Sequence, residues 1–280
     1  MKKMFAIVLA ALMVTALLAG CGSSTAETKA PETTAAPAPA TEAAAPAETE
    51  AAAPAFTTIE AGKLIMSTSA DFPPYEMVAD DGSFEGIDVE IAGAVAAKLG
   101  LELVVDDMDF DAALLAVQQG KSDIVMAGVT VNEDRKMVMS FSDTYSKGVQ
   151  VVIVKEGSDV TLDNLGDQMI GTQRGTTGYI YTSGDYGEDH VTAYDNGASA
   201  VQALMNGQVD CVVIDSAPAT AFVEANPGLV ILDTEYTSED YAIGMNKDNT
   251  ALLEAINGAL KELTEDGTIP AIVEKYIPTK

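Results

Sequence analysis

Short apolar runs alternate with helical patterns along most of this chain, and that alternation restricts its fold more than any other feature of the sequence. The patterns predict strands at residues 63–69, 101–105, 123–127, 169–171 and 211–214, and helices at 88–99, 110–119, 198–206 and 250–265. A glycine, which ends helices readily, stands at or just after the end of each predicted helix. Such strand–helix alternation is typical of an α/β protein.

Two stretches of the sequence resemble each other. Residues 115–126 and 201–212 each contain the end of a predicted helix, a glycine, an aspartate and an apolar strand. The similarity could be that of any αβ unit. Alternatively, it reflects two similar lobes, each with a loop at the carboxyl end of its strand, where open α/β sheets bind ligands. The second interpretation predicts a cleft between the lobes.

The first 55 residues have a different character. Lys2 and Lys3 precede the apolar run 5–19, which predicts an export signal over residues 1–20. The junction 18–21, Leu-Ala-Gly-Cys, resembles a bacterial lipobox and predicts a lipid on Cys21; an ordinary secretory signal with an incidental cysteine is the alternative. Residues 21–55 hold almost only Ala, Pro, Thr, Ser, Gly and Glu, so we expect a disordered tether.

Composition excludes several functions. The chain has 15 Lys and Arg against 43 Asp and Glu, a net charge of −28 that would repel phosphate backbones, so no nucleic-acid partner is expected. One His and two Cys supply little for a metal site, and no phosphate-binding glycine motif occurs. We therefore expect no metal and no cofactor. Cys211 lies in an apolar run and is predicted to be a buried free thiol.

The segment 128–135 indicates an anion site. Asn132 is a plausible helix N-cap, and Arg135 then lies at the helix start. A guanidinium binds a carboxylate through two parallel hydrogen bonds, and the free N–H groups of a helix start favour the same anion. A surface ion pair of Arg135 with Glu133 or Asp134 is the alternative.

A second polar segment and a strand end complete the pattern. Residues 173–178 form a glycine-bearing turn whose amides could approach an anion closely. Asp215 directly follows the strand 211–214 and could accept an ammonium group, with a solvated turn or a helix N-cap as the alternatives. One cation and one anion that face a common cleft suit a zwitterion such as an amino acid.

These segments resemble the family 3 extracytoplasmic solute-binding proteins, the amino-acid-capturing components of ABC importers. The matching stretches are residues 68–76, 86–92, 128–135, 141–145, 174–177, 210–215 and 258–268, and the resemblance covers nearly all of residues 60–278. It implies a two-lobed, periplasmic-binding-protein-like α/β fold (type II), with a ligand cleft between the lobes and a two-strand hinge. The implied lobes are residues 60–147 with 241–278, and residues 148–240, and the hinge lies near 146–149 and 237–241.

The resemblance also implies ligand contacts. Arg135 would clamp the α-carboxylate, aided by the backbone and hydroxyl of Thr130 and the amide of Thr177. Asp215 and the Gly128 carbonyl would hold the α-ammonium. Asp71 would favour a cationic or polar side chain, with a structural cap as the alternative, and Phe72 and Phe110 would form apolar walls, with a place in the core as the alternative. The implied ligand-binding set is Asp71, Phe72, Phe110, Gly128, Thr130, Arg135, Gln173, Thr176, Thr177 and Asp215.

The sequence departs from the family pattern at two positions. Asn132 stands where the family often has Thr, which preserves the predicted cap. Gly178 stands where some relatives place a side chain that touches the ligand, so we expect a wider pocket at that edge, with Gln173 as a compensating contact.

The expected function is that of a receptor, not an enzyme. It would bind a free amino acid, polar or cationic, and deliver it to the membrane subunits of an ABC permease and their ATPase. We expect a monomer, held by its lipid at the extracytoplasmic face of the membrane in a Gram-positive envelope. The alternatives are a cyclohexadienyl or arogenate dehydratase on the same fold, and a receptor that signals or adheres without transport.

Overall fold

The structure is a computed structural model that describes residues 56–233 and 235–278. The predicted signal peptide (1–20), the predicted lipid attachment at Cys21 and the predicted tether (21–55) lie outside the described residues. Among the helices that are described, none is long and apolar enough to cross a bilayer.

A mixed sheet runs through the described chain. Its nine strands follow the order β5 (Glu102–Asp107), β1 (Lys63–Thr68), β6 (Ile124–Val125), β12 (Thr237–Met245), β7 (Ser140–Lys155), β10 (Cys211–Asp215), β8 (Ile170–Gln173) and β9 (Val191–Tyr194), and β11 (Leu229–Ile231) also pairs with β7. A small second sheet contains β2 (Asp71–Phe72), β3 (Glu76–Val78) and β4 (Phe84–Glu85). The strand β6 is shorter than predicted, because only Ile124 and Val125 pair with β1 and β12.

Helices cover this sheet. They are α1 (Ile87–Leu99), α2 (Phe110–Gln118), α3 (Glu133–Val138), α4 (Thr177–Tyr186), α5 (Gly197–Met205), α6 (Ser216–Ala225), α7 (Thr250–Glu265) and α8 (Thr268–Tyr276), with 3₁₀ turns at Leu162–Asp167 and Glu188–His190. In α1, Ile87, Ile91 and Val95 recur every four residues and are all fully buried. The helix ends at Gly100, whose φ of 71° is the left-handed conformation that glycine adopts without strain. The predicted α/β class is confirmed.

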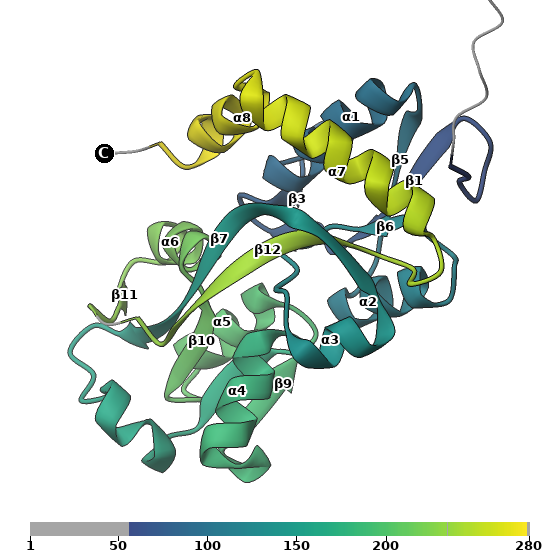
Figure 1. Cartoon of the computed structure of the whole chain (residues 1–280). Helices are drawn as coiled ribbons and strands as arrows, with labels where there is room; N and C mark the ends of the chain where they lie inside the picture. The colour runs from purple at the N-terminus through teal and green to yellow at the C-terminus, as the bar shows by residue number, and fades with distance from the viewer. Residues whose placement is uncertain (1–55, 234, 279–280) are drawn as a thin grey trace, which may run out of the picture. The chain divides into compact units, whose positions relative to one another are not determined.

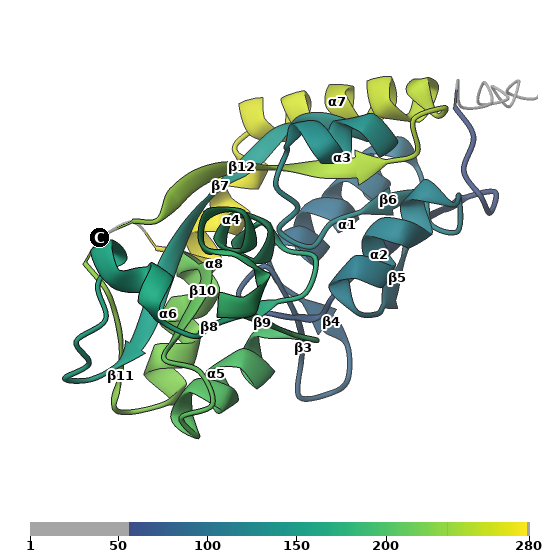
Figure 2. The same ribbon diagram turned by 90° about the horizontal axis from the view of Figure 1, so that it is seen from below.

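Two long strands connect the two ends of the sheet. In Figures 1 and 2, β7 and β12 run side by side from the region of β1, α1 and α7 to the region of β10, α4 and α5. They pair in antiparallel fashion, with Thr237 opposite Gln150 and Tyr241 opposite Ser146. The two segments that sequence analysis assigned to a hinge therefore lie next to each other.

The internal similarity of the sequence has a structural counterpart. Asp123, just before β6, accepts the backbone N–H groups of Ile59 and Ile65 at 2.8 Å each. Asp210, just before β10, accepts the N–H of Met169 at 2.8 Å. In both units an aspartate after a helix and a glycine fixes the start of the neighbouring parallel strand, β1 or β8. The aspartate of the repeated motif thus aligns each strand with its parallel neighbour through hydrogen bonds to the backbone.

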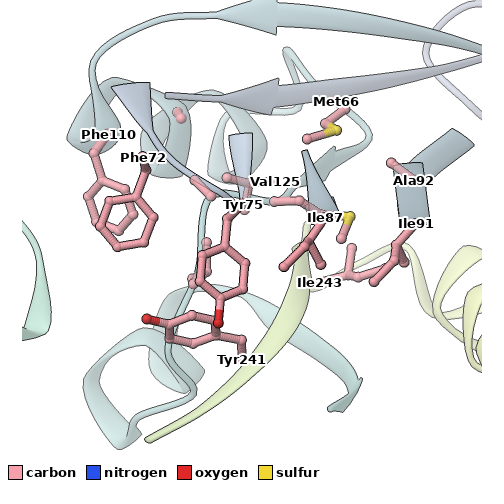
Figure 3. Close-up of a cluster of buried hydrophobic side chains, with 14 of the residues drawn as sticks. Met66, Phe72, Tyr75, Ile87, Ile91, Ala92, Phe110, Val125, Tyr241 and Ile243 are labelled. Atoms are coloured by element: carbon pink, nitrogen blue, oxygen red, sulfur yellow. The ribbon is translucent and has the colours of Figure 1, made fainter. Parts of the chain in front are cut away.

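The apolar core is built around these strands. Figure 3 shows part of it, in which Met66, Val125, Ile87 and Ile243 pack close together. A smaller cluster around β10 contains Cys211, which is fully buried and not disulfide-bonded, as predicted. Burial raises the pKa of this thiol to about 12, so it behaves as a small apolar side chain.

The aspartate motif leads to a stability prediction. Asp123→Ala leaves the buried N–H of Ile65 without its acceptor, and we expect it to lower the free energy of unfolding by about 1–3 kcal/mol. Asp210→Ala removes one hydrogen bond at a more exposed position and should cost less, about 0.5–1.5 kcal/mol. Urea unfolding of both variants measures the difference. An equal or larger loss for Asp210→Ala would contradict this account of the motif.

Candidate functional site

A small cavity lies where the loops after β1, β6, β8 and β10 approach the middle of β7 and β12. Its volume is about 20 Å³, about the space of one or two water molecules. Nine residues of the predicted ligand-binding set line it: Phe72, Phe110, Gly128, Thr130, Arg135, Gln173, Thr176, Thr177 and Asp215. Arg135, Asp215 and the turn 173–178 had been predicted from strand ends and turns, whereas Phe72, Phe110, Gly128 and Thr130 had been implied by the family resemblance; the cavity brings the two groups together.

Arg135 provides the positive charge of the cavity. The side chain of Asn132 accepts the Arg135 N–H at 2.8 Å, so Asn132 is the predicted N-cap of α3. The guanidinium is only 6% exposed and donates to the carbonyl oxygens of Thr130 (2.9 Å) and Gly175 (3.1 Å). It also lies over the Phe110 ring, 5.4 Å from the centroid, in a cation–π contact.

The alternative surface ion pair does not form. Glu133 pairs instead with Lys136 at 2.9 Å. Burial lowers the pKa of Arg135, while the negative charge of Glu239 opposes that shift. A guanidinium has five N–H donors, and the two carbonyl contacts leave others for an anion. The chain's second arginine, Arg174, lies outside the cavity lining and pairs with Asp195 at 2.9 Å on the surface.

Asp215 provides a negative charge in the same cavity. It is 1% exposed and ends β10, and its Oδ1 accepts the Ala217 N–H at 3.0 Å as the N-cap of α6. Its Oδ2 accepts the Val149 N–H (2.8 Å) and the Tyr241 hydroxyl (2.7 Å). Asp215 is therefore both the N-cap of α6 and an acid in the cavity lining, two roles that the sequence left as alternatives. Burial raises its pKa to about 6, and the hydrogen bonds only partly offset this effect.

Two tyrosines and a glycine hold the Asp215 carboxylate in place. The rings of Tyr75 and Tyr241 pack edge to face, with centroids 5.2 Å apart, and Figure 3 shows them below Phe72 and Phe110. Gly148 lies on β7 against this pair. A Cβ at Gly148 would be 2.5 Å from the Tyr241 hydroxyl oxygen and 2.6 Å from Asp215 Oδ2, so no larger residue fits.

Two acidic side chains lie beneath the Gly128 loop. Glu76 and Asp88 are both fully buried, and Asp88 Oδ2 accepts the Gly128 N–H at 2.9 Å. Burial, and then the nearby Asp88 charge, raise the pKa of Glu76 well above its usual range. Burial raises the pKa of Asp88 to about 6. The hydrogen bond from the Gly128 N–H to Asp88 fixes the peptide of Gly128, whose carbonyl was the predicted ammonium ligand.

A third buried acid, Glu239 on β12, changes one expectation. Sequence analysis expected the Thr130 hydroxyl to aid the carboxylate clamp. In the structure this hydroxyl donates to Glu239 Oε2 at 3.1 Å.

At Gly178, sequence analysis expected a wider edge of the pocket. The Gln150 side chain occupies the space beside this glycine, because a Cβ at Gly178 would lie 3.0 Å from Gln150 Oε1.

Asp71 is the one predicted residue that does not line the cavity. It is partly buried and accepts the hydroxyl of Ser69, which does line the cavity, at 3.1 Å. Burial raises the pKa of Asp71. Asp71 begins β2, next to Phe72, which lines the cavity, so it lies beside the cavity wall instead of in it.

Sequence reasoning missed six lining residues: Ser69, Glu76, Ala127, Gln150, Ile214 and Tyr241. Gln150 carried a signal, because it is a lone amide in the otherwise apolar run 149–154. Gln150 and Tyr241 lie on the two strands that had been assigned only a hinge role. Where the chain is described, no group of His, Cys, Asp and Glu side chains is arranged to hold a metal ion.

Comparison with known proteins identifies the family. Residues 64–279 match the model of the bacterial extracellular solute-binding proteins, family 3. A probable histidine-binding protein of Neisseria gonorrhoeae is 32% identical over 218 residues, which are 75% of this chain and 81% of that protein. The arginine-binding protein 1 of an ABC transporter in Escherichia coli is 29% identical over 228 residues, 80% of this chain and 94% of the relative.

The fold is shared with solved structures. A mutant of the arginine-binding protein from T. maritima superposes with a TM-score of 0.73 at 40% identity, covering 78% of this chain and 96% of that one. The predicted two-lobed, periplasmic-binding-protein-like fold is thereby confirmed. The matched domain and these relatives give one answer, and the chain belongs to the bacterial extracellular solute-binding proteins, family 3.

Proposed function

We propose that the protein is an extracytoplasmic receptor that binds a free amino acid in this cavity and delivers it to an ABC permease and its ATPase. The observation that carries the proposal is the pairing of one buried guanidinium, Arg135, with one buried carboxylate, Asp215, in the lining of a single small cavity. A zwitterion neutralises both charges at once. The proposal assigns binding and release to this chain, and no chemical conversion.

The contacts support a defined orientation of the ligand. The free donors of Arg135 and the backbone N–H groups at the start of α4, around Thr177, would take the α-carboxylate. Asp215 and the carbonyl of Gly128 would take the α-ammonium. Because each buried charge is then paired, the bound state avoids the high cost of an isolated ion in a poorly hydrated site.

The side chain of the ligand is polar or cationic in this proposal. Two buried acids, Asp215 and Glu239, accompany the single buried cation Arg135, so a neutral zwitterion leaves more acidic than basic groups at the site. Asp71 adds an acid near the edge of the cavity, and the rings of Phe72 and Phe110 offer faces that attract cations. The arginine-binding and histidine-binding relatives point in the same direction.

Ligand entry requires opening, because a volume of about 20 Å³ does not hold an amino acid. We propose that residues 60–147 with 241–278 form one lobe and residues 148–240 the other, and that β7 and β12 bend near 146–149 and 237–241. Arg135 then belongs to one lobe and Asp215 to the other. Only the closed form lets one ligand pair with both, so the ligand favours closure.

We also propose that the receptor is a monomer held at the extracytoplasmic face of a Gram-positive membrane by a lipid on Cys21, after removal of residues 1–20. Its sequence supports this through the lipobox-like junction and the tether of residues 21–55. Cys21→Ser should move the expressed protein from the membrane fraction into the medium. Retention of the variant in the membrane fraction would contradict the lipid anchor.

A thermal-shift screen against the twenty amino acids tests the function. A ligand that binds only the folded protein raises Tm by mass action. We expect at least one polar or cationic amino acid to raise it, and Arg135→Ala to weaken that binding by about 2–5 kcal/mol in calorimetry, since the carboxylate loses its partner. Arg174→Ala, a surface change outside the cavity, should bind normally. No shift with any amino acid would overturn the proposed function.

The affinity should depend on pH through Asp215. Its pKa is about 6 in the free protein, and an ammonium beside it favours the charged form and lowers that pKa. Binding therefore releases a proton when the pH is near or below about 6. Affinity should be constant above about pH 7 and fall by up to about tenfold per unit below about pH 6, measured by calorimetry.

The variant Asp215→Asn is the control for this pH dependence. It should bind weakly at every pH and with a flatter profile. Asp88 also has a pKa of about 6, and its titration would leave the profile of Asp215→Asn as steep as that of the wild type. That result would assign the pH dependence to Asp88 and contradict the role given to Asp215.

A further inference from the structure

Glu239 is a buried carboxylate whose partners are all neutral. It lies on β12 with 6% exposure, and among the described ion pairs none involves it. Its Oε2 accepts three hydrogen bonds: from the Thr130 hydroxyl (3.1 Å), the Thr177 hydroxyl (3.0 Å) and the Gln150 side-chain amide (3.0 Å). Three separate segments of the chain therefore converge on one oxygen atom.

The three donors line the cavity, whereas Glu239 lies behind them. Thr130 comes from the loop after β6, Thr177 is the first residue of α4, and Gln150 is on β7. In the proposed lobes, Thr130 and Thr177 are on opposite sides of the cleft. Their hydroxyl oxygens are nevertheless only 3.4 Å apart, and both hydroxyls donate to the same oxygen atom of Glu239.

The hydrogens of these hydroxyls determine what the wall can bind. A threonine hydroxyl has one hydrogen to donate and two lone pairs, and both hydroxyls donate that hydrogen to Glu239 Oε2. Because Thr130 and Thr177 each donate to Glu239, their oxygens can only accept hydrogen bonds from a molecule in the cavity. They cannot help to bind its carboxylate, and they favour a group with N–H donors.

The Thr130 oxygen shares a loop and a cavity with the proposed ammonium ligands. Gly128 and Thr130 are two residues apart after β6, and both line the cavity together with Asp215. An ammonium group has three hydrogens to place. Asp215 and the Gly128 carbonyl would take two of them, and the Thr130 oxygen is left as an acceptor for the third.

We propose that Glu239 is a positioning residue for the ligand's α-ammonium: by taking the hydroxyl hydrogens of Thr130 and Thr177, it makes both oxygens acceptors and excludes ligands that lack a donor there. This inference rests on the proposed function. In this proposal Glu239, which does not line the cavity, decides whether the two hydroxyls in the wall donate or accept hydrogen bonds.

The test compares each amino acid with the analogue that lacks only its α-amino group. We choose L-arginine, L-histidine and L-glutamine with their des-amino analogues, measured by calorimetry at neutral pH. Glu239→Leu removes the acceptor at similar size, and it should weaken amino-acid binding about 10- to 100-fold while changing binding of the analogue less than about threefold. Glu239→Gln keeps one acceptor oxygen and should lose less.

Two controls separate this role from a structural one. Asp240→Asn removes the neighbouring acid, which is exposed and pairs with Lys147 outside the cavity lining, and should leave the ratio of the two affinities unchanged. Circular dichroism checks that each variant folds. If Glu239→Leu does not fold, Glu239→Gln decides, with an expected fall in the ratio of about 3- to 10-fold.

The outcomes are distinct. Equal weakening of both ligands in the Glu239 variants means that Glu239 only supports the fold or the closed form, and it overturns this proposal while leaving the proposed function intact. Unchanged affinities overturn it too. A wild-type protein that binds none of the amino acids overturns the proposed function itself.

Discussion

The cost of keeping charges out of water governs the arrangement of this molecule. Arg135, Asp215 and Glu239 are all at least nine-tenths buried, and the described residues place none of them in a direct ion pair. Each is held by neutral groups instead: carbonyl oxygens for the guanidinium, and N–H and O–H donors for the acids. Such contacts make burial tolerable without cancelling the charge. The charges of Arg135 and Asp215, which line the cavity, therefore remain available to a ligand.

The strands β7 and β12 join two roles that are often separate. They are the connection between the two ends of the sheet, and they also carry Gln150, Glu239 and Tyr241 at or behind the cavity wall. In the opening proposed above, Glu239 and Tyr241 belong to different lobes, so a bend would move the acceptor of the Thr130 and Thr177 hydroxyls relative to the partner of Asp215. The binding wall and the proposed hinge share residues, so such an opening would alter the contacts of the site directly.

Local rules of sequence account for much of the fold and for the two principal charges. Arg135 and Asp215 could be found because an N-cap, a strand end and a glycine turn are local patterns, and parallel strands bring their carboxyl ends to one edge. The limits of α1 and α7 followed from glycine stops in the same way. These features depend on residues within one turn or one strand of the site.

The remaining residues could not be found in this way. Glu239 is an ordinary surface acid by its sequence context, between Ser238 and Asp240, and only the pairing of β12 with β7 places it behind Thr130 and Thr177. The raised pKa of Glu76 likewise depends on its burial beside Asp88, which comes from a different element. Asp71 shows a further limit, since its place in a matching motif did not reveal that its carboxylate accepts the Ser69 hydroxyl beside the cavity lining.

Gly148 limits how this site can be re-engineered. The space beside the Tyr241 phenol and the Asp215 carboxylate is too small for a side chain at that position. A larger residue there would force the tyrosine or the aspartate to move and would disturb the hydrogen bond between them. The backbone of the crossing strand thus sets the position of the Asp215 carboxylate, and a designer who redirects the pocket has to keep this glycine.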